Sequence, residues 1–263
     1  MRFVIVSAGV IAAAAGLADA AIIHHWRLDE PASSISTADS VGVVDGLLGG
    51  TAVLGAPGVA GTAMENGYAE FNGVGTLIGG SFSIGFWARR GDTESDRWII
   101  GQGDAPQTRQ SLHIGFRDFD TFSFAFWNDD LDYDNAAVAD TAIYHHWLVT
   151  FDANTLQRRI YRDGNATPVA SDTAGGVFEG SGTNAFWIGQ RADFNGFIGL
   201  LDDVQVYNRV LTGADAQFLF NNPGMPAPIP EPPALLLSLA AATAMLLLAR
   251  RARALRPAPA GHF

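Results

Sequence analysis

An acidic segment in the middle of the chain has the residue types and the spacing to bind a cation. Asp130, Asp132 and Asp134 correspond to positions 1, 3 and 5 of a calcium-binding loop, and Asn135 stands where such a loop turns on glycine. Thr141 replaces the bidentate glutamate that closes an EF-hand loop. Clustered carboxylates repel one another unless a cation or water screens them. Two interpretations remain open, a strand-to-strand loop that binds calcium and a solvated acidic loop.

Two tryptophans have the chemistry to stack on a sugar ring. Trp87 and Trp127 each follow a phenylalanine, and strand alternation points them away from the phenylalanine side. A sugar site combines an aromatic plate with polar groups, and Asp129, Asp130 and Asp132 follow Trp127 closely in the chain. We therefore predict a ligand-binding site from these five residues. The alternative is that both rings fill a second packing layer or cover a sheet edge.

The segments that must position these residues alternate between apolar and polar side chains, with the period of a β-strand. The apolar stripes are Phe82, Ile84 and Phe86; Phe122, Phe124 and Phe126; and, less regularly, Trp147, Val149 and Phe151. Predicted strands cover residues 22–29, 51–54, 68–72, 81–90, 97–102, 110–116, 121–128, 142–152, 157–163, 184–190 and 197–207. One short helix is predicted near residues 212–220, with Thr212 as its cap and Asp215 three residues on. Many short strands joined by Gly and Asp turns predict an all-β fold, an antiparallel β-sandwich.

The composition narrows the range of functions. The chain has 16 Arg, no Lys and 27 acidic residues, and the part from 21 to 229 carries 11 basic and 25 acidic residues, a net charge of −14. So acidic a domain repels a phosphate backbone, and we expect no nucleic acid as a partner. There is no cysteine, which excludes disulfides, a thiol nucleophile and a cysteine-based zinc site.

The two ends of the chain resemble targeting signals. Residues 1–20 have the basic start, apolar run and Ala18-Asp19-Ala20 ending of a secretory signal peptide. Residues 223–233 form a Pro-rich linker, residues 234–249 an apolar run, and residues 250–263 a basic tail. As a helix the apolar run is about 24 Å long, short of the ~30 Å hydrocarbon core, but its flanks favour a transmembrane helix with a cytoplasmic C-terminus.

The order of these C-terminal features resembles the PEP-CTERM sorting signal of Gram-negative, exopolysaccharide-producing bacteria. The matching residues are Pro230, Glu231 and Pro232 before the apolar run and Arg250, Arg251 and Arg253 after it. An ordinary C-terminal anchor is the alternative. The resemblance implies processing by an exosortase-type membrane enzyme. It also implies that the domain between the two signals is first anchored to the inner membrane, on its outer side, and then reaches the cell surface or the extracellular matrix.

The domain itself, residues 21–222, resembles the laminin-G-like, concanavalin-A-like jelly-roll domain of bacterial surface proteins. The motifs that carry the resemblance are HWRLDE at 25–30, FSIGFWAR at 82–89, HHWLVTFD at 145–152, IYRDG at 160–164 and FIGLLDDVQVYNRVL at 197–211. In such relatives a calcium ion often bridges the last strand and the loop after the first strand. The resemblance therefore implies Asp202 and Asp39 as metal ligands. The alternative for Asp202 is a carboxylate that accepts only backbone hydrogen bonds.

Catalytic patterns are weak. Glycoside hydrolysis needs two facing carboxylates, and Glu94-Ser95-Asp96 lacks the final glutamate of the strand motif in laminarinase-type enzymes and lies in a turn. His24-His25 and His145-His146 are adjacent pairs on predicted strands, so their rings point to opposite faces. No Gly-x-Ser-x-Gly or His-Glu-x-x-His motif is present. We expect a protein that is not an enzyme.

The expected function is calcium-assisted binding of a glycan, with the exopolysaccharide of the cell itself as the expected ligand. A structural or adhesive scaffold that binds another surface protein is the alternative, and a glycoside hydrolase is the third class. Exposed tryptophans on a concave face favour the first, whereas a flat apolar patch favours the second.

Overall fold

The computed structural model describes residues 22–229, except for 76, 95, 183 and 193–195, together with Thr243. The predicted signal peptide lies outside the described residues. So do the sorting residues Pro230, Glu231, Pro232, Arg250, Arg251 and Arg253, and the predicted membrane helix apart from Thr243. No helix in the described part of the chain is long and apolar enough to span a membrane.

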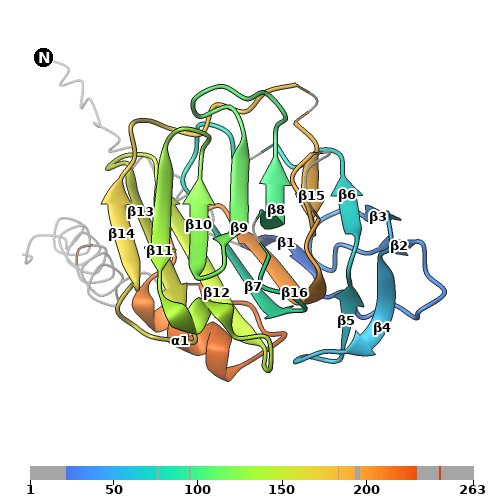
Figure 1. Cartoon of the computed structure of the whole chain (residues 1–263). Coiled ribbons are helices and arrows are strands. Elements are labelled where there is room, and N and C mark those ends of the chain that lie inside the picture. Colours follow the sequence, from blue (N-terminus) through green and yellow to red (C-terminus); the bar gives the residue numbers. More distant parts are fainter. Residues whose placement is uncertain are drawn as a thin grey trace, which may run out of the picture. The chain divides into compact units, whose positions relative to one another are not determined.

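The described chain folds into two antiparallel sheets that stack face to face (Figure 1). The front sheet has the order β11-β10-β9-β8-β15-β6-β3-β2. Its strands are β11 (Asp130–Asp134), β10 (Thr121–Ala125), β9 (Leu112–Asp118), β8 (Arg97–Gln102), β15 (Phe186–Ile188), β6 (Tyr68–Phe71), β3 (Gly46–Gly49) and β2 (Ser36–Thr37). This arrangement confirms the antiparallel jelly-roll sandwich predicted from the sequence.

The back sheet has the order β14-β13-β12-β7-β16-β5-β4, and β1 pairs with β16. Its strands are β14 (Ala170–Thr173), β13 (Gln157–Arg162), β12 (His145–Asp152), β7 (Phe82–Arg90), β16 (Gly199–Tyr207), β5 (Thr62–Glu65), β4 (Val53–Pro57) and β1 (Ile22–Trp26). Two short helices complete the described part, the 3-10 helix η1 (Ala136–Ala139) and the α-helix α1 (Gly213–Asn221).

The hydrophobic core fills the space between the sheets. The three predicted stripes all contribute to one buried cluster, which confirms the alternation seen in the sequence. Phe122 of the front sheet stacks on Trp147 of the back sheet, with ring centroids 3.8 Å apart and an angle of 7° between the ring planes. Packing of this kind fixes which side chains of each strand face inward, and therefore which ones face out.

Helix α1 covers part of the outer face of the back sheet (Figure 1). Thr212 and Asp215 form the predicted capping box, in which each side chain accepts from the other residue's backbone N–H. The helix packs Leu219 into a second buried cluster with Leu148 and Tyr207, whose side chains point away from the main core. This face of the sandwich is thus unavailable for a ligand where the helix lies.

Every strand predicted from the sequence overlaps an observed strand, but five observed strands were not predicted: β2, β3, β5, β11 and β14. The important correction is β11, because the acidic segment was predicted to be a loop. Asp130, Leu131, Asp132, Tyr133 and Asp134 instead pair with β10 along their full length. The alternation of acidic and apolar residues is that of an edge strand, with Leu131 and Tyr133 packed inward.

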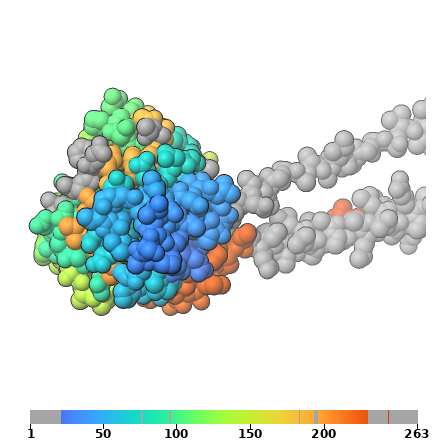
Figure 2. All heavy atoms as spheres, turned by 90° about the vertical axis from the view of Figure 1, so that its right-hand side faces the viewer, coloured from blue at the N-terminus to red at the C-terminus, as the bar shows by residue number. Residues whose placement is uncertain are grey.

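The compact unit extends to Ala227, beyond the boundary at 222 that the sequence suggested. Gly224 N–H donates to Asp203 over 2.7 Å, and Ala227 N–H donates to the Tyr207 hydroxyl over 2.9 Å. Ile22, the first described residue, is the strand partner of Tyr207. Both ends of the unit therefore meet at the end of β16. The front sheet ends at β3 and β2 and the back sheet ends at β4, and these edge strands belong to the blue surface in Figure 2.

Candidate functional site

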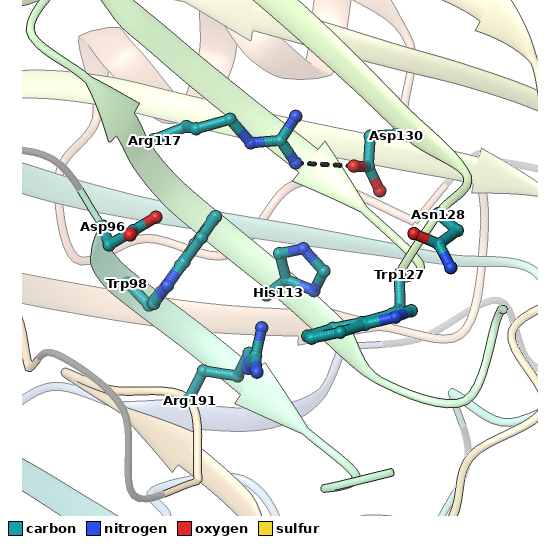
Figure 3. A pocket seen from close by; sticks show the side chains of 8 residues that line it. All are labelled: Asp96, Trp98, His113, Arg117, Trp127, Asn128, Asp130 and Arg191. Carbon is teal, nitrogen blue, oxygen red and sulfur yellow. Dashed lines mark hydrogen bonds and ion pairs between the residues drawn. The ribbon is translucent and has the colours of Figure 1, made fainter. Parts of the chain in front are cut away.

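A pocket of about 340 Å³ opens on the outer face of the front sheet. Its walls come from the start of β8, from β9, from the turn after β10 and from the segment that follows β15 (Figure 3). The lining residues are Asp96, Trp98, His113, Arg117, Trp127, Asn128, Asp130 and Arg191. The volume lies at the small end of the range of ligand pockets, and the lining combines aromatic rings with charged and amide groups.

The turn between β10 and β11 presents Trp127 to this pocket. Phe126 N–H donates to the Asp129 carbonyl over 2.9 Å, which closes a two-residue hairpin loop. Trp127 and Asn128 both have positive φ, 53° and 55°, as in a type I′ turn. Asn and Gly suit such positions, whereas a tryptophan there is strained by its Cβ. A strained residue persists only where surrounding contacts fix it.

Buried ionic contacts supply that fixation. Arg158 of β13, whose side chain is 1% exposed, binds Asp129 Oδ1 over 3.0 Å and Asp172 over 2.6 Å. Asp129 Oδ2 accepts from Gly175 N–H over 2.9 Å. On the other side, the Trp127 carbonyl accepts from Arg109 N–H over 3.1 Å. The turn is therefore held from both sheets, and Asp129 anchors the turn instead of lining the pocket.

Three rings form the aromatic part of the pocket, and one guanidinium packs against them. His113 meets Trp98 edge-to-face with centroids 4.6 Å apart and Trp127 at 6.0 Å. The Arg191 guanidinium lies 4.5 Å from the centroid of the Trp127 ring, a cation–π contact. Figure 3 shows Trp98 and Trp127 on two sides of His113. Trp98 is almost fully buried and Trp127 is half-buried, so Trp127 offers the more accessible ring.

His113 is a neutral hydrogen-bonding group in this pocket. Burial, followed by the charge of Arg191, lowers the pKa of His113 to about 3. Its Nδ1 lies 3.2 Å from the Ser111 carbonyl oxygen, which only accepts, so Nδ1 carries the proton and donates. The other nitrogen, Nε2, is then unprotonated. It can accept a hydrogen bond from a hydroxyl group.

Arg117 and Asp130 form the polar wall of the pocket. Arg117 binds Asp130 over 2.6 Å and Asp132 over 2.8 Å, so one guanidinium joins two carboxylates of the edge strand. Asp132 also accepts from the Ser123 hydroxyl over 2.6 Å. Asp134 accepts from the Thr121 hydroxyl over 2.8 Å. The acidic residues of β11 are thus bound by an arginine and by hydroxyls within a strand, and not in the loop that both interpretations of the sequence assumed.

Of the predicted ligand-binding residues, the structure brings Trp127 and Asp130 together in the pocket. Asp129 and Asp132 lie beside it and bind Arg158 and Arg117. The prediction for Trp87 is wrong: it is 5% exposed, and Phe220 of α1 stacks on it with centroids 5.4 Å apart. It fills a second packing layer, which was the alternative.

Sequence reasoning missed Trp98, His113, Arg117 and Arg191. A signal existed for the residues of β8 and β9. His113 alternates with Leu112 and Ile114, which face the core, so it had to face outward. What the sequence did not contain was the pairing of β8 with β9 and β10 in one sheet. That pairing brings these side chains next to Trp127.

The two predicted metal ligands have separate partners. Asp39 Oδ2 accepts from the His24 ring over 2.7 Å, and Oδ1 accepts from the backbone N–H groups of His25 and Gly42 over 3.0 and 2.9 Å. Burial raises the pKa of Asp39, but these hydrogen bonds outweigh it and hold the pKa below its usual value. An aspartate so fully occupied by protein donors does not fit a calcium ligand.

Asp202 is different, because one of its oxygens is buried without a hydrogen-bond partner. The other oxygen accepts from Val59 and Ala60 N–H over 2.6 and 2.9 Å. Burial raises the pKa of Asp202 to about 7. The strand register shifts between Asp202 and Gln205, so a bulge interrupts the alternation expected from the sequence. In the described part of the chain no group of three or more His, Cys, Asp or Glu side chains is placed to hold a metal.

The fold and the pocket define a jelly-roll sandwich with a concave site on the outer face of one sheet. The chain belongs to the Concanavalin A-like lectin/glucanases superfamily, whose Laminin_G_3 sequence model matches residues 63–217, more than half of the chain. A search of curated proteins gives no match.

Solved structures with the same fold include proteins that bind sugars and proteins. Domain 4 of AbnA, an extracellular arabinanase of Geobacillus stearothermophilus solved with arabinotriose, has a TM-score of 0.59 and 17% identity over 76% of this chain and 98% of that one. The binding domain of botulinum neurotoxin DC, solved with rat synaptotagmin II, has a TM-score of 0.56 and 13% identity over 76% and 51%. The Trypanosoma rangeli sialidase has a TM-score of 0.54 and 15% identity over 76% and 32%. The chain thus spans about half of the toxin domain and a third of the sialidase, and at these identities the likeness shows the fold alone.

Proposed function

We propose that the domain is a non-catalytic carbohydrate-binding module that holds a glycan against Trp127 in the pocket of the front sheet. The single observation that carries the proposal is the conformation of Trp127. A large aromatic residue occupies a left-handed position in a tight turn, where asparagine or glycine is less strained, and its ring lines a pocket. Backbone strain of this kind is characteristic of functional positions.

The surrounding groups suit a ligand rich in hydroxyls. His113 Nε2 accepts, the Asn128 amide both donates and accepts, and the Asp130 carboxylate accepts. Sugars are bound in proteins by an aromatic ring together with a few such polar groups. The complex of the AbnA domain with arabinotriose supports the proposal, because that domain has the same fold along nearly its whole length.

The predicted targeting signals add the location. We propose that the domain is exported and first held at the inner membrane, that an exosortase-type enzyme processes it, and that it then acts at the cell surface or in the extracellular matrix of a Gram-negative bacterium. Its glycan ligand would be a polysaccharide of that matrix. Mass spectrometry of the N-terminus and C-terminus of the protein recovered from the cell surface or the medium tests the proposed export and processing. The expected results are cleavage near Ala20 and near Pro230.

Calcium enters the proposal only at Asp202. A cation there would satisfy the buried oxygen that has no hydrogen-bond partner, and it would stabilise the back sheet without touching a glycan on the front sheet. The test is thermal unfolding in calcium and in chelator. A higher melting temperature in calcium that is lost in Asp202→Asn supports the site, whereas identical curves contradict it.

A second function has one observation in its favour. Ile35, Val43 and Leu47, which lie in or near the edge strands β2 and β3, are 74%, 96% and 61% exposed. Exposed apolar side chains at a sheet edge suit an adhesive contact with another protein. Pull-down with Ile35→Ser and Leu47→Ser as comparison variants separates this role from glycan binding, which these variants should leave unchanged.

The experiment for the leading function is a glycan-binding panel with residues 22–229, which include the whole described part of the compact unit that ends at Ala227. Wild type is compared with Trp127→Asn and with the matched control Phe119→Ser, which changes an exposed aromatic residue outside the pocket. Binding of one glycan that is lost only in the Trp127 variant supports the proposal. Binding that persists in Trp127→Asn, or release of reducing ends from the bound glycan, contradicts it.

A further inference from the structure

The charges in and around the pocket determine which class of glycan it accepts. We propose that the pocket selects uncharged glycan chains and rejects acidic ones such as polyuronates. This inference rests on the proposed function and deepens it. It is carried by the pairing of the pocket's arginines, by the state of His113 and by the charge of the whole domain.

Arg117, the first cation of the pocket, is already neutralised. Its two terminal nitrogens bind Asp130 over 2.6 Å and Asp132 over 2.8 Å. Both carboxylates belong to β11, which pairs along its whole length with β10, so the contact is built into the sheet. An incoming carboxylate would have to displace one of these aspartates, and it would then leave that aspartate without its partner. A neutral hydroxyl can bind to the free lone pairs of the aspartates without breaking the pair.

Arg191, the second cation, also interacts with groups of the protein itself. Its side chain is buried, with 6% of the residue exposed, and its guanidinium lies over the Trp127 ring. Asp96 and Asp130 both act on it electrostatically, and both line the pocket. An acidic sugar that approached Arg191 would therefore bring its charge close to two carboxylates, where like charges repel.

His113 does not supply a third positive charge. Because burial holds it neutral, and because its Nδ1–H donates to the Ser111 carbonyl, it offers only an acceptor to the pocket. A sugar hydroxyl can donate to that acceptor, whereas a carboxylate has no proton to donate. The central group of the pocket is thus complementary to a hydroxyl and is not complementary to an anion.

The charge of the domain acts in the same direction over longer distances. Residues 21–229 carry 25 acidic and 11 basic side chains, and a net charge of this size repels a polyanion before contact. Salt screens this repulsion beyond a Debye length. Binding of a neutral chain does not depend on this repulsion, so the salt dependence of the affinity distinguishes neutral glycans from acidic ones.

The test measures the affinity of residues 22–229 for two sets of polysaccharides at low and at high salt. Arabinan, laminarin and dextran represent neutral chains, and alginate and polygalacturonate represent acidic ones. We expect at least one neutral chain to bind with the same Kd at both salt concentrations. At low salt, both acidic chains should bind at least tenfold more weakly than that neutral chain. An acidic chain that binds as tightly as the best neutral one, through Trp127, overturns the inference and leaves the proposed function standing. If no chain of either set binds through Trp127, the proposed function fails and the inference fails with it.

A charge variant tests the local part separately. Asp96→Asn removes one negative charge from the pocket wall at nearly constant shape, and Asp104→Asn makes the same change at an exposed position outside the pocket. We expect Asp96→Asn to raise the ratio of polygalacturonate affinity to neutral-glycan affinity by roughly three- to tenfold, as expected for one charge at about 6 Å in a partly solvated site. Asp104→Asn should leave the ratio unchanged. Equal effects of the two variants contradict a role for the pocket charges.

Discussion

The conformation of Trp127 predicts an unusual order of stability for two variants at this position. Replacing Trp127 by leucine keeps an apolar side chain that can pack on Arg191, and by ordinary packing it should be the milder change. Replacing it by asparagine removes that packing but places a residue that tolerates positive φ in the turn. If the strain is real, Trp127→Asn is the more stable of the two variants.

The size of the effect follows from the backbone. A left-handed conformation costs an ordinary residue roughly 1–2 kcal/mol, and asparagine pays less of it. Because φ is 53° at Trp127 and the hairpin is closed by the Phe126–Asp129 hydrogen bond, leucine cannot relax without opening the turn. We expect Trp127→Asn to exceed Trp127→Leu in unfolding free energy by about 1 kcal/mol, or about 2–4 °C in melting temperature for a domain of this size.

The assay is chemical and thermal unfolding of the three proteins, combined with glycan binding on the same samples. Both variants should lose binding, because neither carries an aromatic ring. If leucine proves as stable as asparagine or more stable, Trp127 is not strained, and the main argument for a functional role of this residue is refuted.

Three further predictions concern the framework of the site and the domain. Arg158→Met leaves Asp129 and Asp172 without their buried partner, so it should cost about 3–5 kcal/mol in denaturant unfolding; a loss below 1 kcal/mol would show that the turn is held by other contacts. Burial lowers the pKa of His146 to about 4 from 6.5, so the unfolded chain takes up the proton first and stability falls as pH drops from about 6.5 towards 4, by up to roughly 3 kcal/mol. His146→Gln should flatten this part of the stability–pH curve, and an unchanged slope would assign the acid sensitivity to other groups. A chain that ends at residue 222 loses the hydrogen bonds from Gly224 and Ala227 and should be about 2–4 kcal/mol less stable than one that ends at 229; equal melting temperatures would argue against this role of the C-terminal segment.

The sequence was sufficient for the fold because the core is built from strands with strong alternation. The stripes that contain Phe82, Phe122 and Trp147 face inward as predicted. They lie on β7 and β12 in the middle of the back sheet and on β10, next to the edge strand of the front sheet. Alternation also contains the information for β11, but the aspartates suggested a metal loop and hid the inward-facing Leu131 and Tyr133. In that segment the acidic residues belong to an exposed edge strand, and two of them bind Arg117 of β9, two strands away in the sheet.

The site was only partly predictable, because it depends on contacts between segments far apart in the chain. Trp127 and Trp87 have the same local pattern, yet α1 packs on one of them and the other lies at a hairpin turn. The sequence predicted the helix but not the face that it covers. Arg117 and Arg191 reach the pocket through strand pairing and through the segment after β15, which no local pattern indicates. The bulge that follows Asp202 in β16 is likewise not indicated by the alternation of the sequence.

The most direct test of a glycan site at Trp127 is an NMR titration of the tryptophan indole N–H signals. The described chain contains Trp26, Trp87, Trp98, Trp127, Trp147 and Trp187, and each signal can be assigned with a Trp→Phe variant. On addition of the glycan that binds best in the panel, the signals of Trp127 and Trp98 should shift in a saturable manner while those of Trp87 and Trp147 stay in place. Saturable shifts confined to other tryptophans, or no shift at all while the glycan is bound, would contradict the account.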